Sequence, residues 1–205
     1  TPRRAVSGAA LLRNECRVTV FRVPDRPGAA RTIFSKIARC NVAVDMIVQN
    51  VADDGTTDIS FTVQKGDFPD TVAAAKAASV EIGAGGIDFE NDVAKISIVG
   101  LGMADTPGVA AKMFRTLADA GINILMITTS EIKVSVLVSQ HDAAAALKVV
   151  HTAFELDRLK DDGAQERLVR FNTGDAFDDS GGAGNDLAEQ VEINTACSED
   201  GRDLE

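Results

Sequence analysis

The sequence of 205 residues contains no tryptophan and no tyrosine, and only two histidines and three cysteines. Because it also has no basic stripe, it offers neither a stacking platform for bases nor a surface for phosphates, and we expect no nucleic-acid partner. Cys16, Cys40 and Cys197 show no Cys-x-x-Cys spacing, which argues against a zinc site. His141 and His151 lie ten residues apart in one predicted surface helix, so neither a metal site nor a catalytic triad is expected.

Long apolar runs are also missing. No stretch of eighteen apolar residues occurs, and the first residues lack the basic and apolar regions of a signal peptide. We therefore expect a soluble, cytoplasmic protein that does not enter a membrane.

The net charge of -10 is concentrated near the end of the sequence. Residues 173–205 contain ten acidic residues and one basic residue, a net of -9, which leaves -1 for the other 172 residues. Rich in Gly, Asp, Ser and Asn, this segment cannot bury enough apolar surface to offset the entropy lost on ordering. We predict an acidic, largely disordered tail over residues 156–205; a docking element is the alternative.

Two stretches of the sequence repeat each other with an offset of 80 residues, which indicates duplication of one unit. Pro27-Gly28 corresponds to Pro107-Gly108. The matches continue with Ala30 and Ala110, Phe34 and Phe114, Ala38 and Ala118, and Met46 and Met126.

Each unit begins with an alternating strand, at residues 18–20 and 96–98, followed by a helix with a proline in its first turn. Apolar residues recur at helical spacing, so each helix is expected to lay one face on a sheet. These stripes are Ala30, Ile33, Phe34, Ile37 and Ala38, then Ala110, Met113, Phe114, Leu117 and Ala118. Two strands and a second helix follow in each unit: residues 42–48, 59–63 and 67–78, then 122–126, 132–138 and 142–154.

Each βαββα unit needs one more strand to close its sheet. Residues 87–93 are available to the first unit, but the second has no obvious strand directly after residue 154. The edge must be filled, and the candidates are residues 168–171 and residues 5–12. We favour residues 5–12, which makes the first unit an insertion within the second.

An Asp-x-Pro-Gly sequence between the first strand and the first helix of a duplicated βαββαβ unit resembles the ACT domain, a ferredoxin-like fold that senses amino acids. The consecutive stretches VPDRPGAARTIF, NVAVDMIVQNV, KISIVGLGMADTPGVAAKMF and NILMITTSEIKVSVLV resemble the paired ACT region of aspartokinases, and the likeness runs over residues 5–154. It implies an α+β fold of two ferredoxin-like βαββαβ ACT modules, the first inserted in the second, with antiparallel sheets and helices on one face.

The predicted division of the chain follows from that fold. Residues 1–14 would supply a strand of the second module, residues 15–93 the first module, residues 94–155 the second module, and residues 156–205 the tail. The resemblance implies an allosteric regulatory subunit or region of aspartate kinase, the enzyme that phosphorylates L-aspartate with ATP at the first step towards lysine, threonine and methionine. The family's effectors are lysine and threonine, which the sequence does not rank.

Aspartokinases carry a Lys-Phe-Gly-Gly-type nucleotide and aspartate site in a kinase domain, and no such sequence occurs in these 205 residues. We therefore expect no catalytic residue and no cofactor in this chain, ATP and Mg²⁺ belonging to the kinase domain. The expected partners are a catalytic subunit or domain and a second copy of the chain, in a homodimer formed through the ACT modules. Whether the chain is a natural small subunit or a fragment of a larger enzyme stays open.

The Asp-x-Pro-Gly loops suit an amino acid chemically. The start of a helix presents unpaired N–H groups and a positive dipole to a carboxylate, and glycine lets the backbone come close. Asp25 and Asp105 would face the ammonium, although an aspartate before a helix is also a common N-cap. The amides of Gln49 and Asn123 can read a side chain or the amino acid's own head group.

The resemblance places these residues in two effector sites. The first comprises Asp25, Gly28, Ala29, Ala30, Gln49, Asn123 and Ile124. The second comprises Asn41, Val42, Asp105, Gly108, Val109, Ser130 and Glu131.

Three other functions compete with this interpretation. Gly100-Leu101-Gly102 after a strand resembles the start of a dinucleotide fingerprint, but position 105, where the third glycine belongs, is an aspartate. A purely structural pairing module would have the same fold. An ACT-type regulator of another amino-acid biosynthetic enzyme would share the loops.

Overall fold

The structure, a computed structural model, describes residues 5–156. The predicted tail lies outside this range except for its first residue. Short 3-10 turns precede the second and fourth helices. The helices are α1 (Ala29–Arg39), α2 (Phe68–Ile82), α3 (Val109–Asp119) and α4 (Ala143–Ala153), and the strands are β1 (Gly8–Pro24), β2 (Ile47–Val51), β3 (Thr56–Gln64), β4 (Gly86–Val99), β5 (Met126–Thr129) and β6 (Lys133–Ser139).

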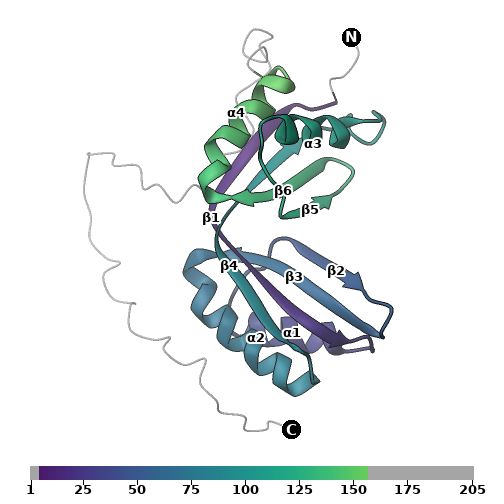
Figure 1. The fold of residues 1–205 in the computed structure, drawn as a ribbon, viewed down its shortest axis with the longest axis vertical. Helices are drawn as coiled ribbons and strands as arrows, with labels where there is room; N and C mark the ends of the chain where they lie inside the picture. The colour runs from purple at the N-terminus through teal and green to yellow at the C-terminus, as the bar shows by residue number, and fades with distance from the viewer. Residues whose placement is uncertain (1–4, 157–205) are drawn as a thin grey trace, which may run out of the picture.

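All six strands form one antiparallel sheet in the order β2-β3-β1-β4-β6-β5. The predicted order of helices and strands is confirmed, but the two expected sheets are joined. The first module contains β2, β3, α1 and α2, and the second contains β5, β6, α3 and α4, with β1 and β4 running through both (Figure 1).

The joining strands β1 and β4 each fuse two strands that the sequence predicts separately. Residues 8–12 of β1 pair with residues 95–99 of β4 beside β6, whereas residues 17–21 pair with residues 86–90 beside β3. Register shifts on both sides of Glu15, and a positive φ of 60° at Asn14, mark the passage between modules. The early segment therefore supplies a strand to the second module, and the first module is inserted in the second.

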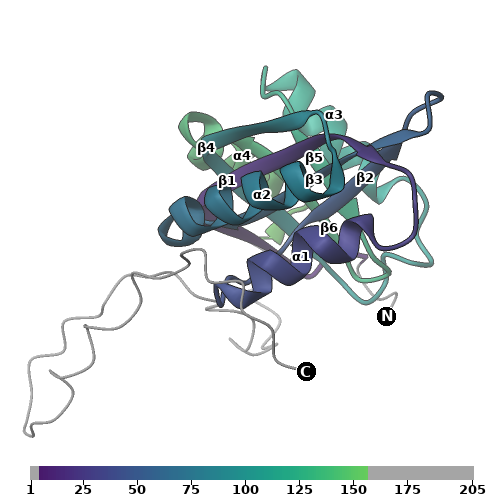
Figure 2. The same ribbon diagram turned by 90° about the horizontal axis from the view of Figure 1, so that it is seen from below.

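Each module has its own apolar core between its sheet and its two helices. Ile33, Ile37 and Phe61 are among the buried residues of the first core, and Met113 and Leu117 are among those of the second. Figure 2 shows α1 and α2 side by side across the strands of the first module. A third cluster, made of Met46, Val93, Met126 and Leu137, packs where the modules meet.

Charged side chains surround that junction. Arg17 forms a 2.9 Å ion pair with Glu90 and donates a hydrogen bond to the Leu125 carbonyl at 3.3 Å. Lys95 pairs with Asp45, which lies in the other module. The contacts of Arg17 with Leu125 and of Lys95 with Asp45 join residues of different modules, so they hold the two modules against each other.

Two local predictions need correction. Pro27 and Pro107 precede the N-cap glycines of α1 and α3, so they lie outside the helices and not in their first turns. The stripes also end earlier than expected, because Ala38 and Ala118 are exposed near the last turn, beyond the edge of the sheet contact. None of the helices in the described part of the chain is long and apolar enough to cross a membrane.

Candidate amino-acid-binding site

The turn before α1 exposes an aspartate next to open backbone donors. Gly28 is the N-cap with a φ of 94°, and no side chain caps the helix. The Asp25 backbone N–H donates to the Gly55 carbonyl at 3.0 Å, which fixes the loop to the β2–β3 turn. Its exposed carboxylate has no hydrogen bond or ion pair with any described residue. The interpretation of Asp25 as an N-cap is therefore wrong, and the same holds for Asp105 because the N-cap of α3 is Gly108.

Five of the seven residues predicted for the first effector site line one pocket of about 370 Å³. At the start of α1 the N–H of Ala29 donates a hydrogen bond to the Arg26 carbonyl, and the N–H of Thr32 donates one to the Gly28 carbonyl. The N–H of Ala30 has no backbone acceptor among the described residues and is available to an anion. The five residues are Asp25, Gly28, Ala29, Ala30 and Gln49.

The other two residues of that predicted site lie elsewhere. Strand β2 separates the pocket, which Gln49 lines, from a second groove of about 370 Å³ lined by Val48, Asn50 and Ile124. Asn123, the neighbour of Ile124, lines neither of the two. Within one chain, therefore, the second module does not contribute to the pocket before α1.

Thr57, which is not among the residues predicted from the sequence, also lines the pocket. This residue is buried, pairs with Val23 across β1 and β3, and donates its hydroxyl to the Asn50 carbonyl at 2.8 Å. The alternation of residues along β3 could have indicated this position, because Thr57 lies on the same face of the strand as Ile59, which lines the same pocket. Its oxygen can still accept a hydrogen bond from a ligand.

The residues predicted for the second effector site are more dispersed. Gly108, with a φ of 86°, and Val109 line a groove of about 310 Å³ at the start of α3, but Asp105 is not among its lining residues. Ser130 and Glu131 lie in the exposed β5–β6 turn, which joins the loop before α3 through a 3.0 Å bond from the Gly100 N–H to the Ile132 carbonyl. Asn41 and Val42 follow α1 in the first module.

Packing explains the Gly100-x-Gly102 sequence that prompted the nucleotide-binding alternative. A Cβ atom at Gly100 would lie 2.0 Å from the Ala5 carbonyl oxygen, so only glycine lets residues 5 and 6 cross at this point. The Ser7 N–H then donates to the Val99 carbonyl at 2.8 Å. Gly100 therefore allows residues 5–8 to pack against the end of β4 in the second module.

Comparison with known proteins agrees with the fold. Two sequence models of the ACT domain match the chain, one over residues 17–80 and the other over residues 96–154. These ranges correspond to the two modules. The chain is thus a tandem ACT-domain protein.

Similar proteins indicate which kind of tandem ACT-domain protein this chain is. The chain is 48% identical over 152 residues to an aspartokinase of Pseudomonas aeruginosa, a match that covers 74% of this chain and 37% of the relative. It is 51% identical to a chain in a crystal structure of aspartokinase alpha and beta subunits, covering 74% of this chain and all of that one, with a TM-score of 0.69. The regulatory subunit of aspartate kinase from Thermus thermophilus, solved without ligand, is 41% identical, covering 73% of this chain and 99% of that one, with a TM-score of 0.69.

The chain belongs to the aspartate kinase family and forms its ACT-domain regulatory region. It spans a little over a third of the length of the curated aspartate kinases that it matches.

Proposed function

We propose that this chain senses lysine, threonine or both, and controls an aspartate kinase activity that resides in a kinase domain or catalytic subunit. ATP and Mg²⁺ would be bound by that partner, in the cytoplasm, where the amino acids are made. Support comes from the pocket before α1, where an unpaired carboxylate, an open helix N-terminus and an amide line one cavity.

The head group of an amino acid fits this arrangement. Its carboxylate would accept hydrogen bonds from the N–H groups at the start of α1, and its ammonium would pair with Asp25. Gln49 and Thr57 would contact the side chain. A threonine hydroxyl would find a hydrogen-bond partner in either residue, whereas a lysine ε-ammonium would reach for an acidic or carbonyl oxygen.

We also propose that a second copy completes the site. Within one chain Asn123 and Ile124 do not line the pocket, so these residues would come from the second module of a partner chain. The sheet edges β2 and β5 are unpaired within the described residues and expose Ile47, Val51 and Ile127. Pairing through these edges would cover apolar surface and place two different modules together.

Calorimetric melting of the full chain with and without each amino acid tests the proposal. At a hundredfold excess over Kd, binding stabilises the folded state by about 2.7 kcal/mol, so lysine or threonine should raise the melting temperature clearly. Asp25→Ala removes a charge-assisted contact and should weaken binding by roughly ten- to a hundredfold. Gln49→Ala should have a smaller effect.

The matched control is Asp53→Ala, which removes an exposed aspartate from the β2–β3 turn and leaves the pocket intact. It should keep the full rise in melting temperature. An equal loss in the Asp25 and Asp53 variants, or no rise with either amino acid in the wild-type chain, would contradict the proposed site.

A further inference from the structure

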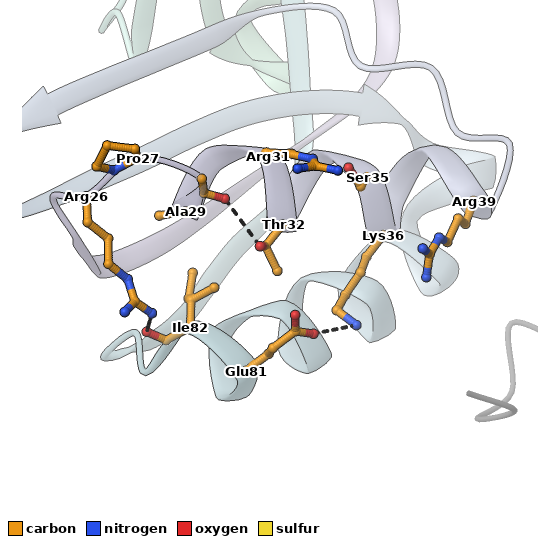
Figure 3. A pocket seen from close by; sticks show the side chains of 11 residues that line it. Arg26, Pro27, Ala29, Arg31, Thr32, Ser35, Lys36, Arg39, Glu81 and Ile82 are labelled. Atoms are coloured by element: carbon orange, nitrogen blue, oxygen red, sulfur yellow. Dashed lines mark hydrogen bonds and ion pairs between the residues drawn. The ribbon is translucent and has the colours of Figure 1, made fainter. Parts of the chain in front are cut away.

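A groove on the outer face of the first module gathers basic side chains (Figure 3). It has a volume of about 440 Å³ and runs between α1 and the end of α2. Arg26, Arg31, Lys36 and Arg39 line it, and Glu81 is the only acidic residue among its lining residues. The groove, called here the basic groove, therefore carries a net charge of +3.

Most of this charge is unpaired. Lys36 forms a 2.8 Å ion pair with Glu81, and Arg26 donates a hydrogen bond to the Ile82 carbonyl at 3.5 Å. Arg31 and Arg39 are exposed and have no ion pair with any described residue. Like charges held along one short helix repel each other, so a partner of opposite charge would be stabilising.

The internal repeat shows that the fold does not need these charges. At the offset of 80 residues, the second module has no base at any of the four equivalent positions, although α3 packs on its sheet as α1 does. The four bases of the basic groove are thus a feature of the first module, whereas α3 carries Lys112 and Arg115 at the positions that correspond to Thr32 and Ser35. The equivalent residues are Thr106, Ala111, Thr116 and Asp119.

We propose that the basic groove is the docking surface for this chain's own acidic segment, residues 173–205. That segment carries a net charge of -9 in a protein whose other residues sum to -1. Three of the four bases, Arg31, Lys36 and Arg39, are spread along α1, an 11-residue helix about 16 Å long, which suits an extended acidic chain better than a single small anion.

The covalent connection raises the concentration of the acidic segment around the basic groove of its own chain. Residues 157–172 can span up to about 55 Å when extended, and a tethered segment has an effective concentration on the order of millimolar. Several weak, exposed ion pairs therefore suffice. The proposal does not depend on amino-acid binding, because its test contains no amino acid.

Protection from a glutamate-specific protease tests the docking in the full chain. The rate of cleavage after Glu189 and Glu192 is measured by mass spectrometry. It is divided by the rate at which the protease cleaves a free peptide with the sequence of residues 184–197, because this ratio corrects for effects of salt on the protease. We expect protection at low ionic strength and its loss at about 1 M salt, where the Debye length falls to about 3 Å.

The groove variant Arg31→Ser/Arg39→Ser should raise the normalised cleavage rate about three- to tenfold at low ionic strength. The matched control Lys76→Ser/Arg115→Ser removes the same charge from exposed positions on α2 and α3 outside the groove, and should leave the rate unchanged. Reversing charge on both sides, with Arg31→Glu/Arg39→Glu and Asp178→Arg/Asp179→Arg, should restore protection.

Three results would overturn the proposal. Cleavage of the wild-type chain at the rate of the free peptide would show that the segment does not dock. Equal effects of the groove and control variants would show that the acidic segment is attracted by the overall positive charge of the modules and not by the basic groove. Protection that rises with protein concentration would place the segment on a second copy.

Discussion

At the scale of single residues, Gly28 sets the direction in which the chain enters α1. Its φ of 94° is a conformation that costs other residues roughly 1–2 kcal/mol, and a Cβ atom there would meet no neighbour. Gly28→Ala should therefore lower the free energy of unfolding by about 1 kcal/mol without any clash. Chemical denaturation measures this change.

Gly66 provides the control for that prediction. It also has open space around it, but its φ lies outside the left-handed region. Gly66→Ala should leave the chain equally stable or slightly more stable, because alanine restricts the unfolded state. Equal destabilisation by both alanines would refute the role assigned to the backbone conformation.

Glu15 is the second residue with a measurable consequence. It is fully buried at the module junction, where Gln64 donates to one carboxylate oxygen while the other has no hydrogen-bond partner among the described residues. Burial raises the pKa of Glu15 above its ordinary value of 4.5, and the nearby charge of Lys95 offsets part of that effect.

The folded state therefore holds this proton at pH values where the unfolded chain has released it. As pH rises from 4.5 through the raised pKa, the contribution of Glu15 to stability falls. Glu15→Gln, which keeps an acceptor for Gln64, should remove this slope and be at least as stable as wild type at pH 7. The exposed Glu131→Gln serves as control; a wild-type slope that persists in Glu15→Gln would disprove the prediction.

At the scale of elements, the helices and their order were predictable because the repeat presents each apolar stripe twice. The fusion of strands into β1 and β4 was not, since alternation reports which residues face a core but not whether two strands are continuous. The late starts of β2 and β5 have a related cause. Val42 and Ile122 alternate like strand residues and are buried, yet they belong to the connections after α1 and α3.

The insertion of one module in the other predicts a specific weak point. Gly100→Ala would place a methyl group against the backbone of Ala5, so residues 5–8 would have to move away from β4. We expect a loss of about 1–3 kcal/mol in the free energy of unfolding. Gly8→Ala, whose Cβ would meet only the Val99 side chain at 3.4 Å, should cost much less. Equal stability of the Gly100 variant and wild type would argue against this crossing.

At the scale of the whole molecule, the unpaired edges predict a homodimer. Val51 on β2 is 68% exposed and Ile127 on β5 is 42% exposed, and both lie at sheet edges that pair with no further strand of residues 5–156. Sedimentation should show a dimer at tens of micromolar protein, and Val51→Lys/Ile127→Lys should shift it towards monomer. A wild-type monomer with and without lysine or threonine would contradict edge pairing.

The candidate site was predictable only in part, because some of its predicted residues depend on how modules of two chains meet. The residues of the turn before α1 are contiguous and Gln49 lies opposite Ile59 on the adjacent strand, so local geometry brings them together. Asn123 and Ile124 depend on how modules meet, and neither sequence spacing nor a single chain determines that contact.

The most direct test of the sensing role is isothermal titration of the full chain with lysine and threonine and with analogues that lack one half of the head group. At least one amino acid should bind, its decarboxylated amine and its N-acetyl derivative should bind far more weakly, and nucleotides should not bind. Binding that survives loss of the carboxylate or the ammonium, or binding of a nucleotide in place of either amino acid, would contradict recognition of the head group by Asp25 and the start of α1.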